Sequence, residues 1–217
     1  MLLVGFVALL LQAAPQAQNA VVTGVSKPEP RGRPQSWLTD DDYPARALSR
    51  REFGTVKFRA DVDAEGNLTG CHVLGSSGYS DLDEMVCKML LKRAVFRPAR
   101  DSAGQDIPHP YDGSFHWNLP GRPGGHNPVS DVASKPEGLA VELKAVPRSY
   151  ANPALLRMVF ADGKMKGCTV ELSSGNPKLD AIACQQAGVQ VAPLKIEGAR
   201  LPQPNSRMVE ARFEASK

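Results

Sequence analysis

Residues 66–87 read GNLTGCHVLGSSGYSDLDEMVC, and residues 163–184 read GKMKGCTVELSSGNPKLDAIAC. The two stretches share the pattern G-x-x-x-G-C-x-V-x-x-S-S-G-x-x-x-L-D-x-x-x-C at a constant offset of 97 residues. Agreement at so many positions without a gap indicates an internal duplication. Two copies are too few for a solenoid, so the sequence predicts two similar small domains.

The first copy has the periodicity of a hairpin followed by a helix. Residues 55–62 alternate apolar and polar side chains, which predicts a half-buried strand, and residues 68–74 predict the returning strand after a Gly-containing turn. Ser80 is a candidate N-cap for the helix. Residues 111–118 then predict a third strand. The helix has one continuous apolar stripe, formed by Leu82, Met85, Val86, Met89 and Leu90.

The second copy repeats this plan. Residues 155–160 and 166–172 predict its hairpin, and residues 207–214 predict its last strand. Asn176 is the expected N-cap of the helix, with a proline at the first helical position, and Gly188 is the expected end. Alanine replaces valine and leucine at two positions of the apolar stripe, which predicts a smaller core for this half.

The predicted fold class is α+β, with two small two-layer domains. Each domain is expected to be an antiparallel three-stranded sheet covered by a helix, in the order β-β-α-β, with a short extra N-terminal helix in the first. The expected segments are a signal peptide over 1–20, a linker over 21–40, the first domain over 41–119, a Pro/Gly linker over 120–137 and the second domain over 138–217.

The four cysteines recur with the duplication. In each copy one cysteine falls on the second predicted strand and the other on the helix expected to cover it, 16 residues later. Of the three possible pairings, Cys71 with Cys87 and Cys168 with Cys184 are therefore the expected disulfides. Closing a loop of this length contributes about 3 kcal/mol in the chain-entropy model.

The N-terminus predicts export. Residues 1–11 are an apolar run followed by small residues, which is typical of a cleaved secretory signal peptide. The run is shorter than the roughly 20 residues needed to span a bilayer. Retention of this segment as an inner-membrane anchor is the alternative. No Lys or Arg precedes the apolar run, and Lys27 is the first charged residue.

The composition excludes several classes of protein. The 217 residues are 42% hydrophobic and 23% charged, which excludes a wholly disordered chain and a multi-span membrane protein. The formal net charge of +3, with 6% aromatic residues, does not support a nucleic-acid-binding surface.

The first copy resembles the C-terminal domain of TonB-family proteins. The motifs that carry the resemblance are Tyr43-Pro44, Gly54-x-Val56-x-Phe58, Ser76-Ser77-Gly78, Leu82-Asp83, Phe96-Arg97-Pro98-Ala99 and Trp117, in the order of the family. The second copy lacks the Tyr-Pro and Phe-x-Pro-Ala motifs, so it is expected to be a degenerate repeat.

The resemblance implies a periplasmic protein that binds an extended peptide. Domains of this family bind the TonB box of outer-membrane transporters by adding a strand at the sheet edge. The implied partner is therefore a protein or peptide, such as an outer-membrane TonB-dependent receptor, and the implied process is transmembrane transport. The residues implied to bind it are Tyr43, Pro44, Tyr111, Gly113, Phe115 and Trp117.

Two features separate the sequence from a complete energy transducer. Contact with the proton-channel proteins of the inner membrane would need an anchor, for which residues 1–11 are too short, and residues 27–34 are too short for the long periplasmic spacer. The alternative function is a soluble adaptor or structural protein of the envelope without energy transduction.

The sequence does not predict an enzyme. The glycines and serines of residues 75–78 lack the nucleophile-elbow pattern, and a turn at a helix start explains them. No pair of histidines has helical metal-ligand spacing. No catalytic residue, metal site or cofactor is therefore expected, and no nucleic acid partner.

Overall fold

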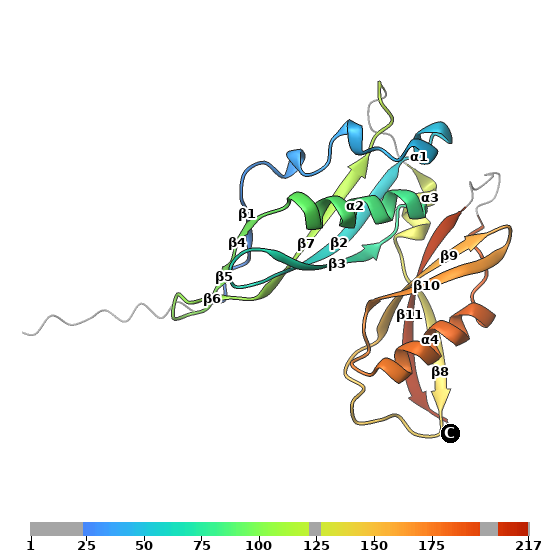
Figure 1. Cartoon of the computed structure of the whole chain (residues 1–217). Helices are drawn as coiled ribbons and strands as arrows, with labels where there is room; N and C mark the ends of the chain where they lie inside the picture. The colour runs from blue at the N-terminus through green and yellow to red at the C-terminus, as the bar shows by residue number, and fades with distance from the viewer. Residues whose placement is uncertain (1–23, 122–126, 196–203, 217) are drawn as a thin grey trace, which may run out of the picture.

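The computed structural model describes residues 24–121, 127–195 and 204–216. Two sheets, each with a helix across one face, lie side by side in an elongated molecule (Figure 1). The expected signal peptide over 1–20 lies outside the described residues. Within the described part of the chain, no helix is long and apolar enough to cross a membrane.

The first half is built on a sheet with the strand order β3-β2-β7. Strands β2 (Gly54–Val62), β3 (Leu68–Gly75) and β7 (His109–Trp117) pair antiparallel. Helix α2 (Ser80–Arg93) packs across one face, because the apolar stripe predicted from the sequence is the face that it buries. The short extra helix is α1 (Ala45–Ser49).

The second half repeats these elements and adds one. Strands β9 (Ala154–Ala161), β10 (Lys164–Leu172) and β11 (Asn205–Ala215) correspond to β2, β3 and β7. A further strand, β8 (Glu137–Leu143), pairs parallel with β11 and gives the order β10-β9-β11-β8. The predicted α+β class is confirmed, but this sheet has four strands where the sequence predicted three.

Helix α4 (Pro177–Gln190) covers the second sheet, and its start follows the sequence prediction. The side chain of Asn176 accepts hydrogen bonds from the backbone of Lys178 at 2.9 Å and of Leu179 at 3.4 Å. The prediction that Gly188 ends the helix is wrong. Helical hydrogen bonding continues to the N–H of Val191, which donates to the carbonyl of Ala187 at 2.9 Å, so the glycine is carried inside the last turn.

In each half, the Ser-Ser-Gly and Leu-Asp motifs form a hydrogen-bond network around the aspartate. The carboxylate of Asp83 accepts from the hydroxyl of Ser76 at 2.5 Å and from the N–H and hydroxyl of Ser77 at 2.8 Å each. In the second half, Asp180 accepts from Ser173 at 2.6 Å and from the N–H of Ser174 at 2.8 Å.

The network changes how the start of α2 is explained. The prediction that Ser80 is the N-cap is wrong: the N-cap is Tyr79, and its side chain makes no capping bond. Asp83, inside the first turn, holds the loop instead. Gly78, with a φ of 93°, turns the chain where other residues would be strained.

Both predicted disulfides are confirmed. Cys71 on β3 joins Cys87 on α2, and Cys168 on β10 joins Cys184 on α4. Each bridge therefore ties a strand to the helix that covers it.

The two halves are packed together. The N–H of Ser206 at the start of β11 donates to the carbonyl of Gly78 at 3.0 Å, and its hydroxyl reaches Asp83 at 2.7 Å. Beside this contact, the N–H of Val73 donates to the carboxylate of Glu171 at 2.8 Å. Arg157 forms a buried ion pair with Glu171 at 2.7 Å. A buried polar interface therefore joins the sheets, in which Nη1 of Arg157 and the side-chain amide of Asn205 have no hydrogen-bond partner.

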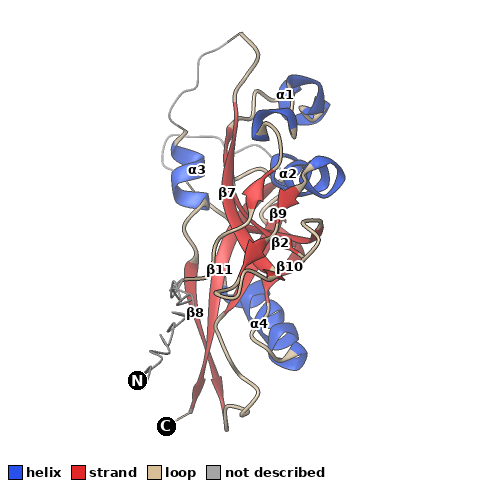
Figure 2. Cartoon of the chain, turned by 90° about the vertical axis from the view of Figure 1, so that its left-hand side faces the viewer, coloured by secondary structure: helices blue, strands red, loops and turns tan. Residues whose placement is uncertain are grey.

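Two segments expected to be linkers carry structure. Trp37 and Leu38, in the 21–40 segment, are buried in the core of the first half. The 120–137 segment contains helix α3 (Pro128–Ala133), whose Ser130 hydroxyl donates to the carbonyl of Ser77 at 2.9 Å. Figure 2 shows α1, α2 and α4 on one side of the sheets and α3 on the other.

Candidate functional site

Strand β7 is the exposed edge of the first sheet. It pairs with β2 along its whole length, from Gly54 opposite Trp117 to Val62 opposite His109. Its other edge pairs with no strand among the described residues. The corresponding strand of the second half, β11, is flanked on that side by β8 (Figure 1). Backbone N–H and C=O groups on an unpaired edge can pair with an added strand.

The side chains on one face of β7 fix it to β2. Asp112 accepts two hydrogen bonds from the guanidinium of Arg59, at 2.7 Å each. Nδ1 of His116 lies 2.7 Å from the hydroxyl of Thr55. The Arg59 pair lowers the pKa of Asp112, because the ionised carboxylate is the form that the guanidinium binds. These cross-strand pairs stabilise the pairing of β7 with β2.

The opposite face of β7 borders an apolar groove. The groove has a volume of about 190 Å³ and runs between β7 and the N-terminal segment. A Cβ at Gly113 would lie 2.6 Å from Cζ of Phe58, so the glycine makes room for that buried ring. The lining residues are Pro34, Gln35, Trp37, Leu38, Phe58, Leu90, Tyr111, Gly113, Ser114 and Phe115.

An ion pair fixes the far wall of the groove. Arg93 at the end of α2 binds Asp42 through two bonds, at 2.5 and 2.9 Å, and donates to the carbonyl of Trp37 at 3.1 Å. The hydrogen bonds from Arg93 lower the pKa of Asp42 to about 2. The N-terminal segment is therefore held beside β7 at a fixed distance.

The end of β7 is anchored in the core by aromatic contacts. Trp117 is buried, and its ring meets that of Tyr43 edge-on with centroids 5.0 Å apart. The Tyr43 hydroxyl donates to the backbone carbonyl of Glu52. Burial raises the pKa of Tyr43 to about 12, so this tyrosine stays protonated and donates. Phe115 packs edge-on against Trp117 at 4.9 Å.

The structure brings together most of the residues that the resemblance implied. Tyr111, Gly113 and Phe115 line the groove, and Trp117 and Tyr43 form the buried support at one end of the strand. Pro44 is half-buried at the start of α1 and lines a different hollow, with Met85 of α2.

Sequence reasoning missed the groove itself. Its far wall is Trp37 and Leu38, which lie in a segment too short and irregular to show a period. The only sequence signal was an apolar Trp-Leu pair in an otherwise polar stretch. Among the described residues, no group of three His, Cys, Asp or Glu side chains is placed to hold a metal ion.

The comparison with protein families agrees with this geometry. Residues 40–119 match the family of the Gram-negative bacterial TonB protein C-terminal. The match begins just after Trp37 and Leu38 of the groove wall and ends just after β7. No curated protein and no solved structure matches the chain significantly.

Proposed function

Because residues 40–119 form a TonB C-terminal domain, we propose that the edge of β7 binds an extended peptide by strand addition. Domains of this family are periplasmic and take part in protein interactions and TonB-dependent transport. The observation that carries the proposal is the unpaired outer edge of β7 beside a preformed apolar groove. The proposed partner is a TonB box-like segment of an outer-membrane transporter.

The geometry supports both affinity and selectivity. The backbone groups of β7 would supply hydrogen bonds to any extended chain, whatever its sequence. Alternate side chains of an added strand face one side of the sheet, so those on the groove side would lie over Phe58 and against Trp37. Apolar or β-branched residues at every second position of the peptide therefore fit best.

The proposed location is the periplasm, after cleavage of the segment over 1–20. Both disulfides require an oxidising compartment to form and persist, which supports export. The module acts as a binding protein in this proposal and performs no chemistry itself.

A titration followed by NMR tests the proposal. A TonB box-like peptide should shift the amides of β7 (His109–Trp117) and leave those of β8 (Glu137–Leu143) unchanged. The same peptide with proline at its central position should bind far more weakly, because it loses a backbone donor. Shifts that are equal for the two peptides would show side-chain binding without strand addition.

The alternative is an envelope adaptor that uses the same edge to bind another copy of itself. The observation that favours it is that the two halves pack into one unit, as expected for a protein with a structural role. A dimer in solution with β7 amides protected from exchange, and no peptide binding, would establish this alternative.

A further inference from the structure

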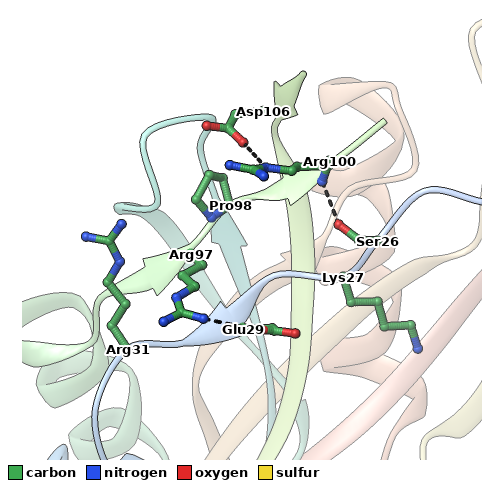
Figure 3. Close-up of a pocket in the computed structure, with 8 residues that line it drawn as sticks. All are labelled: Ser26, Lys27, Glu29, Arg31, Arg97, Pro98, Arg100 and Asp106. Atoms are coloured by element: carbon green, nitrogen blue, oxygen red, sulfur yellow. Dashed lines mark hydrogen bonds and ion pairs between the residues drawn. The ribbon is translucent and has the colours of Figure 1, made fainter. Parts of the chain in front are cut away.

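A basic cleft opens at the end of the first half that lies away from the second. It has a volume of about 460 Å³ and lies between the N-terminal segment and the short strands after α2 (Figure 3). These elements are β1 (Glu29–Pro30), β4 (Phe96–Arg97), β5 (Ala99–Arg100) and β6 (Asp106–Ile107). Its charged lining consists of the cations Lys27, Arg31, Arg97 and Arg100 and the carboxylates Glu29 and Asp106.

The backbone places these charges on one surface. Pro28 is buried and Pro30 half-buried, while the residues that alternate with them, Lys27, Glu29 and Arg31, are exposed. Alternation of this kind puts all three charged side chains on the same face of an extended segment. The prolines therefore hold the segment against the domain and turn its charges outward.

Hydrogen bonds fix the segment in this position. The N–H of Ser26 donates to the carbonyl of Arg100 at 2.9 Å, and the Ser26 hydroxyl accepts from the N–H of Arg100 at 2.7 Å. At the other end, the N–H of Arg31 donates to the carbonyl of Val95 at 2.8 Å. The cations of the segment are thus held beside those of β4 and β5.

The carboxylates of the cleft balance only half of its positive charge. Arg97 lies 3.8 Å from Glu29, and Arg100 lies 2.8 Å from Asp106. No carboxylate of the lining is left for Lys27 and Arg31. Asp112, on which the charge of Lys27 also acts, is already bound by Arg59. The cleft therefore carries an excess of positive charge, which a bound anion would offset.

Exposed apolar side chains flank the basic cleft. Val25 precedes the first lining residue and is 53% exposed, and Val95, whose carbonyl holds Arg31, is 45% exposed. Leu91, in the last turn of α2, is 50% exposed. A cationic surface bordered by apolar side chains fits the interface of an anionic membrane, where phosphate lies beside hydrocarbon. An acidic peptide would not need the apolar border.

We propose that this cleft binds the phosphate groups of anionic phospholipids, and that it seats the end of the first half on a membrane surface. Arg31 and Arg97 contact phosphate, with Lys27 and Arg100 adding charge. The β7 edge is a separate surface, so this inference does not depend on the proposed function.

Vesicle binding by the full chain tests the proposal. The charge-neutralising variant R31Q/R97Q is compared with K144Q/R148Q, which removes the same charge from exposed positions of the second half. The vesicles contain either a mixture of phosphatidylglycerol and phosphatidylcholine or phosphatidylcholine alone. The apolar residues 1–11 are present in every variant, so the difference between variants is the readout.

The proposal expects selective, salt-sensitive binding. R31Q/R97Q should lower the affinity for anionic vesicles by about tenfold or more, since each basic residue near an anionic surface adds to the attraction. K144Q/R148Q should bind like the wild type, and zwitterionic vesicles should show no difference among the three proteins. Unchanged thermal unfolding of both variants shows that the fold is kept.

Four results would overturn the proposal. The first is equal binding of R31Q/R97Q and the wild type to anionic vesicles, and the second is an equal loss of that binding in R31Q/R97Q and K144Q/R148Q. The third is saturation by millimolar inorganic phosphate of the amide shifts at residues 26–31, without vesicle binding, which would leave an ion site only. The fourth is binding of a polyglutamate peptide in place of vesicles, which would assign the cleft to an acidic protein.

Discussion

The two halves differ most at one edge. In the first half the outer edge of β7 pairs with no strand within the described residues, whereas in the second half β8 runs parallel to β11 and covers the matching edge. An unpaired edge is an aggregation hazard that proteins generally cover or blunt. The chain covers this edge in one copy only. The difference supports a use for the open edge in the other.

The helices of the two halves, α2 and α4, also differ in the apolar side chains that they bury. Three large side chains of α2, Leu82, Val86 and Leu90, are buried against the first sheet. The corresponding residues of α4 are Leu179, with alanines at the other two positions. The second half thus buries less apolar area under its helix, and the fourth strand supplies sheet area in compensation. The open copy has the larger core and does not need its edge closed.

The largest expected effect is a difference in stability between variants of Asp83 and Asp180, which hold the two Ser-Ser-Gly and Leu-Asp networks. Asp83→Ala should lower the free energy of unfolding by about 3–5 kcal/mol, because it leaves several buried donors without an acceptor, including the Ser206 hydroxyl of the other half. Asp180→Ala should cost only about 1–2 kcal/mol, since Ser173 is exposed and can turn to water. Denaturant unfolding with the disulfides intact measures both.

Equal losses for these two variants would contradict the idea that Asp83 joins the halves. Ser206→Ala is the control, since it removes only the contact across the interface.

The next effect compares the disulfides. Each closes a loop of the same sequence separation, 16 residues, so replacing either pair by alanine should cost about 3 kcal/mol. The consequences should differ, because the second half has the weaker core. Without Cys168–Cys184, hydrogen exchange in α4 should rise well before that in α2.

Removing Cys71–Cys87 provides the reverse experiment. If α4 again lost its protection first, the order in which the helices lose protection would reflect the weaker core of the second half. If α2 lost its protection first, each disulfide would stabilise only its own half.

A smaller effect tests the groove with two matched glycines. Gly113→Val places a side chain against Phe58 and should weaken peptide binding by about tenfold, or roughly 1.4 kcal/mol. Gly138→Val on β8 is the control, because a Cβ there meets nothing within 4 Å. Peptide affinity is measured by titration after the β2–β7 pairing has been verified by NMR. Equal affinities would place the peptide away from the groove.

The structural elements that occur in both copies of the duplication could be predicted from the sequence. The shared string located both hairpins, both helices and both disulfides, because each depends on contacts within about 20 residues. Strand β8 escaped prediction because it lies outside the repeated unit. Its partner is β11, so Glu137 pairs with Val209, far along the chain. Nothing local in Glu137–Leu143 distinguishes a strand that closes an edge from one inside a hairpin.

The candidate site divides in the same way. The strand was predicted over residues 111–118, and its place at the edge and the role of Tyr111, Phe115 and Trp117 were implied by the resemblance to the TonB family. The groove was not, because Trp37 and Leu38 reach β7 only through tertiary packing. The ion pair between Asp42 and Arg93 that holds them joins residues that no spacing rule connects.

That ion pair gives the smallest expected effect, a loss of stability in acid. The pKa of Asp42 is about 2 in the folded protein, below the ordinary value of 3.8, so the unfolded state takes up its proton first as the pH falls. The stability from the pair is complete above pH 4 and is lost as the pH drops toward 2. Solvent screening limits the loss to about 1 kcal/mol.

Asp42→Asn should flatten the stability of the protein between pH 4 and pH 2, measured as the midpoint of thermal unfolding at each pH. Asp41→Asn is the control, since Asp41 is exposed and no ion pair involves it in the described structure. The last turn of α4 has no basic residue, so the second half has no counterpart to this contact. In the acid-sensitive step, the side chain of Trp37 should therefore become exposed to water, which changes its fluorescence. The amides of α4 should stay protected from hydrogen exchange. Loss of that protection in the same step would show that the two halves unfold as one unit.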